Sequence, residues 1–190
     1  ETLFFPIFER LQQAKIAEFL VIQFSWSSQV EINRISALAS EKKLDYIHIP
    51  VLKKLPSSLG AVLTMITKKN RVLILIRSKN IEIVMPSSTL PDFLTLLLTS
   101  NLRKMGVKVI FDADGLPIQE RVDFANLDPN SLIYKLLSRV EKEALQNSDR
   151  IITRSNASIL WHLKKMPSLS PDKFFKVING RDTTKFYFDP

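Results

Sequence analysis

Two aspartates, two residues apart, are the side chains in this sequence whose type and spacing best suit chemistry. Asp112 and Asp114 follow an apolar run, and Gly115 comes directly after them. On a continuing strand, both carboxylates would point to the same side of the sheet. Such a pair can bind a metal, act as a base or accept hydrogen bonds from sugar hydroxyls. The pair can equally form a turn in which each aspartate bonds its own backbone, and both interpretations remain open.

The charged residues continue beyond this pair. Glu120 and Arg121 follow within a few positions, and residues 112–123 as a whole predict an acidic loop after a strand. For Glu120 and Arg121 we expect pairing with each other or with the next helix, rather than a direct catalytic role.

Two later segments also place polar residues after apolar runs. Arg154 and Ser155 follow the run RIIT, and Ser155 is expected to cap a helix, whose free N–H groups could also bind an anion. Capping is the simpler of these two interpretations. Asn179 and Gly180 follow a last short apolar run and predict a tight turn at its end.

Composition argues against several kinds of site. The chain has no cysteine and only two histidines, His48 and His162, which lie far apart in sequence. We therefore predict no thiolate or histidine-rich metal site, with His48 in a strand and His162 on a helix surface. The patterns GxGxxG, Walker A, GxSxG and HExxH do not occur in the sequence. A dinucleotide-binding fingerprint is thus excluded, and no cofactor is predicted.

The charge balance is basic, at +8 over 190 residues with a pI near 9.7. This suits a phosphorylated substrate or an anionic membrane surface, although lysine and arginine can simply solvate helix faces. The basic residues are not interleaved with aromatic ones, so nucleic acid is not an expected partner. We see no apolar run long enough to span a bilayer and no signal peptide.

Short apolar runs alternate with segments of helical periodicity along the chain. Strands are predicted at residues 19–24, 46–51, 81–85, 107–111, 150–153 and 175–178, with a strand or its remnant at 2–5. Helices are predicted at residues 7–17, 30–43, 57–77, 89–104, 130–147 and 155–165. Pro50 should end its strand, and RVLILI (71–76) should be helical, because the next strand follows too closely for a parallel crossover.

The predicted helix at 130–147 shows a well-defined apolar face. Its members are Leu132, Ile133, Leu136, Leu137, Val140 and Ala144. Strands that alternate with such helices form βαβ units. The sequence therefore predicts an α/β, Rossmann-like three-layer domain with a mostly parallel sheet and helices on both faces. One domain over residues 1–180 accounts for almost the whole chain.

Three motifs in order resemble the N-terminal half of a retaining glycosyltransferase of the GT-B fold ("group 1", family 4). Residues 111–115 and 120–123 (FDADG and ERVD) match the family loop FDxRGxxxxERVD. Residues 141–149 match E-x-x-x-L-x-x-A-D in part and lead to IIT and Ser155. Residues 177–186 (VINGRDTTKF) are similar to the closing motif V-I-P-N-G-V-D-x-x-x-F. The resemblance covers residues 80–190 well and the earlier part only by element order.

This resemblance implies an enzyme that moves a sugar from a nucleotide-sugar donor to a glycan or lipid-linked acceptor. It makes this chain the acceptor-side domain, inactive alone. Residues 181–190 would begin the linker to a donor-binding domain outside this sequence. The implied location is cytoplasmic, with peripheral contact at an anionic membrane. The substrate-binding residues it implies are Asp112, Asp114, Gly115, Glu120, Ser155, Asn179 and Gly180.

The sequence departs from the family pattern at three places. The Gly-rich loop after the first strand is not visible near Phe5, and Met85 and Ser87 replace a His and an Arg that often end the fourth strand. Asp114 stands where the family has Arg. The rival interpretation is a stand-alone flavodoxin-like or receiver-like domain, in which Asp112 and Asp114 would hold Mg²⁺ or receive a phosphate.

Overall fold

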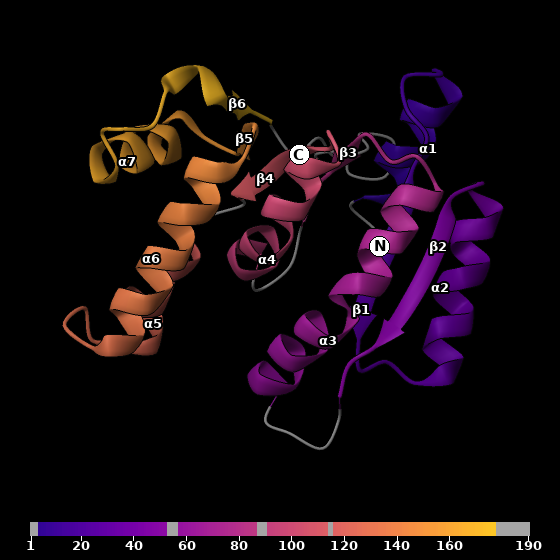
Figure 1. Ribbon diagram of the computed structural model, residues 1–190, viewed down its shortest axis with the longest axis horizontal. Coiled ribbons are helices and arrows are strands. Elements are labelled where there is room, and N and C mark those ends of the chain that lie inside the picture. The colour runs from indigo at the N-terminus through magenta and orange to yellow at the C-terminus, as the bar shows by residue number, and fades with distance from the viewer. Residues whose placement is uncertain (1–3, 53–56, 87–90, 114–115, 178–190) are drawn as a thin grey trace, which may run out of the picture. The chain divides into compact units, whose positions relative to one another are not determined.

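The computed structural model describes residues 4–52, 57–86, 91–113 and 116–177. These belong to two compact units, Glu1–Thr67 and Lys68–Pro190. Figure 1 shows the elements of both units in chain order. We describe each unit by itself.

The first unit alternates helices with two parallel strands. Its elements are α1 (Phe5–Gln13), β1 (Leu20–Ser25), α2 (Gln29–Glu41), β2 (Asp45–Pro50) and the first half of α3 (Ser57–Ser78). Strand β1 pairs with β2 from Leu20↔Asp45 to Ser25↔Pro50. A small core of Phe5, Ile35, Ala39 and Leu44 joins α1 and α2 to this pair.

The second unit contains a four-stranded parallel sheet in the order β3-β4-β5-β6. Its elements after α3 are β3 (Ile83–Val84), α4 (Pro91–Lys104), β4 (Lys108–Ala113), α5 (Pro117–Ala125), α6 (Leu132–Asn147), β5 (Arg150–Thr153), α7 (Asn156–Lys165), the 3-10 turn η1 (Pro171–Lys173) and β6 (Phe174–Lys176). Strand β4, which precedes the acidic residues, is an internal strand. It pairs with β3 at Lys108 and Val109, near its amino end, and with β5 from Ile110 to Ala113.

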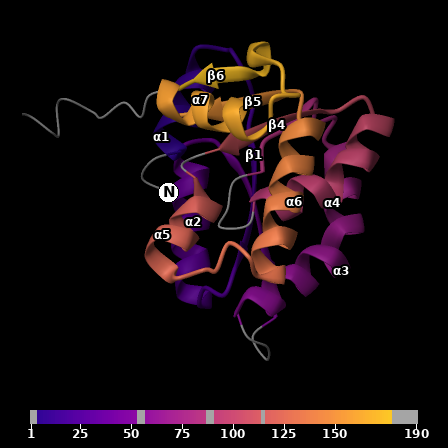
Figure 2. The same cartoon turned by 90° about the vertical axis from the view of Figure 1, so that its left-hand side faces the viewer.

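Helix α6 contacts helices α4 and α7 of the second unit. Helices α4 and α6 run side by side, which Figure 2 shows clearly. Helix α7 contacts α6 through an ion pair between Lys165 Nζ and Glu141 Oε2, 2.9 Å apart. The core beneath is formed by Phe111, Ala113, Ala144, Leu145, Ile151, Met166, Leu169 and Phe174.

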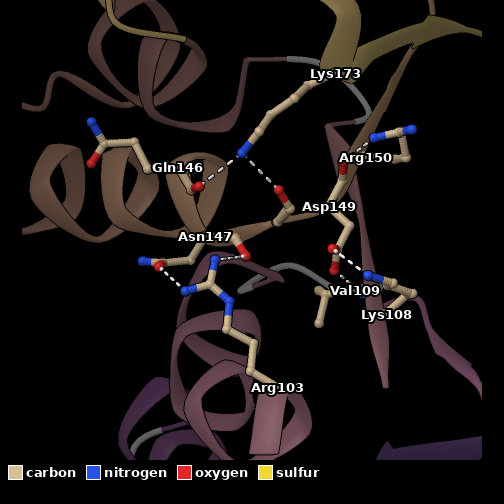
Figure 3. A network of polar contacts seen from close by, with 9 residues as sticks. Arg103, Lys108, Val109, Gln146, Asn147, Asp149, Arg150 and Lys173 are labelled. Carbon is tan, nitrogen blue, oxygen red and sulfur yellow. Dashed lines mark hydrogen bonds and ion pairs between the residues drawn. The ribbon is translucent and has the colours of Figure 1, made fainter. Parts of the chain in front are cut away.

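A polar network holds the amino ends of β4 and β5 together (Figure 3). One carboxylate oxygen of Asp149 accepts the Val109 N–H at 2.8 Å, and the Asp149 N–H donates to the Val109 carbonyl at 2.9 Å. The other oxygen lies 3.5 Å from Lys108 Nζ. Because these bonds join the residue before β5 to the start of β4, they align the two strands.

The same network completes the carboxyl end of α6, where helix carbonyls lack partners within the helix. Lys173 Nζ donates to the carbonyls of Gln146 and Ser148 at 2.9 Å each. Arg103 donates to the Asn147 carbonyl at 3.0 Å. Cations are favourable at this end of a helix. Burial lowers the pKa of Lys173, and the nearby charge of Arg103 lowers it further.

The predicted fold class is confirmed: the chain is α/β and Rossmann-like, with all paired strands parallel. Pro50 ends β2, and residues 71–76 are helical within α3, as predicted. Phe5 was expected in a strand but begins α1. That helix ends at Gln13 rather than residue 17, because Lys15 adopts a left-handed conformation with φ of 55°. The predicted domain end at residue 180 and the linker 181–190 lie outside the described residues.

Helix α5 was not predicted, because residues 112–123 were interpreted as one acidic loop. Pro117 stands in the first turn of α5, where its missing N–H costs nothing. Glu120 Oε1 accepts the Leu116 N–H at 3.4 Å, which supports the same turn. The sequence signals for this helix, a proline followed three residues later by a glutamate, were present but were outweighed by the charge pattern.

His162 was predicted on a helix surface, and this is wrong. Its side chain is buried in α7, with only 1% of the residue exposed. The Trp161 ring meets the imidazole edge-on and Phe174 stacks beside it, with centroids 5.1 and 6.1 Å away. Neither ring nitrogen has a hydrogen-bond partner among the described residues. Burial, together with the charge of Lys165, lowers the pKa of His162 to about 4.

The buried His162 predicts that the folded chain loses stability as the pH falls. Below pH 6.5 the unfolded chain binds a proton at His162, whereas the folded chain does so only near pH 4. The free energy of unfolding should therefore fall by ~3 kcal/mol between these values. Urea titrations from pH 7 to 4 should show this loss in the native chain, and His162→Leu should remove that part of the slope. An unchanged slope in His162→Leu, with His48→Gln as control, would contradict the prediction.

Candidate functional site at the carboxyl ends of β4 and β5

Asp112 is the penultimate residue of β4, and its side chain is turned inward. Only 4% of this side chain is exposed. The guanidinium of Arg154, which directly follows β5, lies 3.7 Å from Asp112 Oδ1. Asp112 is therefore a carboxylate with a cation beside it, and the pair joins the carboxyl ends of two neighbouring strands.

The strand register explains why these residues meet. Asp112 is aligned with Ile152, and Ala113 with Thr153, so β4 and β5 end at the same level. On the other side of β5, Thr153 is aligned with Lys176, and the Val177 N–H donates to the Thr153 carbonyl at 2.8 Å. The carboxyl ends of three adjacent strands thus lie side by side. Ligands of open parallel α/β sheets bind outside such an edge.

Ser155 caps α7, as predicted. Its Oγ accepts the Ser158 N–H at 3.1 Å, and Ser155 itself is exposed. Beneath this cap, the hydroxyls of Thr153 and Ser158 are buried without a hydrogen-bond partner among the described residues. The first turn of α7 therefore places polar groups beside the Asp112–Arg154 pair.

Glu120 lies in α5 and is exposed. Its hydrogen bond with the Leu116 N–H is a contact with its own helix turn, which agrees with the structural role expected for it. Asp114, Gly115, Asn179 and Gly180 lie outside the described residues. The structure therefore brings together Asp112 and Ser155 of the predicted set, while Glu120 serves the first turn of α5.

Sequence reasoning missed two charged partners. Arg154 was noted only as a neighbour of Ser155, although an arginine immediately after one strand can reach an aspartate at the end of the next. Glu141 was part of a motif, but its burial was not foreseen. Its side chain is 3% exposed, and Lys165, which pairs with it, also lies over the Trp161 ring at 4.5 Å.

The described residues show no group of three or more His, Cys, Asp or Glu side chains that could hold a metal ion. Within the same residues, no helix combines the length and the apolar character needed to cross a membrane. The sequence matches no protein-family model, and a search of curated proteins finds no significant match.

We predict that removing the cation of the Asp112–Arg154 pair lowers the free energy of unfolding. Arg154→Ala removes the guanidinium beside the buried carboxylate of Asp112, so we expect the free energy of unfolding to fall by about 2 kcal/mol. The loss is smaller than for a fully buried pair, because Arg154 is partly screened by solvent. Urea unfolding at pH 7 measures this loss. Adding Asp112→Asn should restore part of the stability, because the amide carries no charge.

Arg139→Ala is the matched control, because Arg139 forms an exposed pair with Glu143 four residues away at 3.0 Å. It should cost less than about 0.5 kcal/mol. Equal losses in Arg154→Ala and Arg139→Ala would show that the Asp112–Arg154 pair does not contribute as a buried interaction.

Proposed function

We propose that this chain is the acceptor-binding domain of a retaining GT-B glycosyltransferase. The whole enzyme would transfer a sugar from a nucleotide-sugar donor to a glycan or lipid-linked acceptor. The donor would bind mainly to a second domain. This chain alone would bind acceptor but not transfer sugar.

One observation carries the proposal. Described residues from three family-like segments, 111–113, 151–155 and 177, include or directly follow the carboxyl ends of β4, β5 and β6, whereas the motif at 141–149 lies mainly in α6. These strands are neighbours in the sheet, so motifs separated by up to about 60 residues of chain reach the same edge. Residues that follow parallel strands meet on one side of any such sheet, so the support for the proposal is that the family-like residues occupy these positions.

The described residues suggest how an acceptor would be held. Arg154 neutralises Asp112, so the edge can present hydrogen-bond donors without a surplus of buried negative charge. The exposed first turn of α7, at Ser155, supplies backbone N–H groups of the kind that favour an anionic group on a substrate. Asp114, two residues beyond Asp112, is the residue we propose to accept hydrogen bonds from sugar hydroxyls.

The receiver-like alternative is less well supported. It requires Asp112 and Asp114 to share a Mg²⁺ ion or to receive a phosphate. The guanidinium beside Asp112 would compete with such a cation. The acidic pair also follows β4 rather than the first strand, where receiver-like domains need it.

The proposed acceptor role of Asp114 predicts a specific loss of binding. Asp114→Asn should raise the dissociation constant for glycan acceptors at least about tenfold, because a charge-assisted hydrogen bond is lost. Saturation-transfer NMR against a panel of oligosaccharides and lipid-linked sugars would identify the ligand and measure this change. Asp172→Asn, an exposed carboxylate before β6, is the matched control and should bind normally.

Two results would count against the proposal. The first is Asp114→Asn that binds acceptor as the native chain does. The second is a native chain that binds Mg²⁺ and a phosphate mimic such as beryllofluoride but no glycan, which would favour the receiver-like alternative.

A peripheral membrane contact belongs to the same proposal and rests on the net charge of +8. Binding to vesicles containing phosphatidylglycerol should weaken steeply between 50 and 300 mM salt (roughly a fall in Debye length from 13 to 6 Å), because screening weakens attraction to the surface. Vesicle flotation measures it. Binding that does not change with salt would argue against an electrostatic contact.

A further inference from the structure

Half of the apolar face predicted for α6 is exposed, namely the three residues in its first two turns. Leu132 is 83% exposed, and Ile133 and Leu136 are 63% exposed. Ala144 is buried, as predicted, together with Glu141 and Leu145, which were not part of the predicted face. Scattered exposed apolar residues are ordinary, but a cluster of them on one surface marks an interaction site.

Helix α5 and the following loop extend this apolar surface. Figure 1 shows α5 and α6 as a hairpin joined by that loop. Phe124, near the end of α5, is 85% exposed. A shallow hollow of about 430 Å³ lies between the two helices, with Ala125, Leu127, Ile133 and Leu137 in its lining and Arg121 and Asp128 among its polar members. A projecting aromatic ring and an apolar hollow therefore occupy the same hairpin.

The charges of this hairpin argue for a protein partner rather than an anionic one. Residues 117–147 contain four basic and five acidic residues, in a chain whose net charge is +8. Arg139 and Glu143 already pair with each other at 3.0 Å. The hairpin thus lacks the positive surplus that a nucleic acid or an anionic lipid surface would require. An apolar centre with charges of both signs around it is typical of protein interfaces.

We propose that the α5–α6 hairpin is the interface through which two copies of this chain form a twofold dimer. In a twofold interface the same patch meets itself, so a projection must find a hollow on the same surface. Phe124 of each copy fills the hollow beside Ile133 and Leu137 of the other. Leu132 and Leu136 are covered around this contact, and the balanced charges let the rim of one copy face the rim of the other. This inference does not depend on the proposed function.

Sedimentation equilibrium and light scattering of the full chain over a range of concentrations test the proposal. We expect a dimer that dissociates on dilution. Phe124→Ser should raise the dimer dissociation constant at least about 30-fold, since aromatic anchors at the centre of an interface dominate its energy. Its circular dichroism should match that of the native chain, because Phe124 is exposed. Leu160→Ser is the matched control, because Leu160 is 67% exposed on α7, and it should leave the dimer intact.

The variant Ala125→Trp distinguishes a specific dimer interface from nonspecific association through apolar surface. The added ring fills the hollow and should abolish the dimer, although it increases the apolar surface. A native chain that is monomeric at all concentrations would overturn the proposal, as would Phe124→Ser or Ala125→Trp dimers as tight as the native one. Salt-independent flotation with vesicles that is lost in Phe124→Ser would also overturn it, because the hairpin would then be a membrane-insertion surface.

Discussion

A buried ion pair between Glu141 and Lys165 joins helices α6 and α7 in the second unit. A carboxylate with almost no exposed surface needs a cation within reach, and Lys165 of α7 supplies it. Glu141 lies on the side of α6 that also buries Ala144 and Leu145 in the core. Leu132, Ile133 and Leu136 face outward. The ion pair and the core contacts thus share one side of α6, and the apolar surface of the α5–α6 hairpin lies on another.

The amino ends and the carboxyl ends of the strands in the four-stranded sheet have different roles. At the amino ends of the strands, Asp149 forms hydrogen bonds with the backbone of Val109. Arg103 and Lys173 donate hydrogen bonds to the last carbonyls of α6. These contacts are structural, join residues 27 to 44 positions apart in sequence, and align β4 with β5. The alignment brings Asp112 and Arg154 within ion-pair distance at the carboxyl edge. The candidate site thus depends on interactions at the opposite end of the same strands.

Much of the fold could be predicted because its signals are local. Apolar runs marked the strands, Pro50 ended one of them, and Ser155 capped α7. Local signals failed where two of them competed. Around Pro117 the charge pattern suggested a loop, while proline and Glu120 favoured a helix, and the helix prevailed. At His162 the polar ring suggested exposure, but its position between Trp161 and Phe174 buried it.

The sequence by itself determined the α/β class, the order of helices and strands, and the polar residues that end each strand, because these follow from periodicity and from local backbone chemistry. Tertiary structure alone decided which strand ends are neighbours, that Arg154 lies beside Asp112, and which side of α6 is buried. Such outcomes depend on strand register and helix rotation. Both are set by contacts between residues distant in sequence, which no local pattern contains.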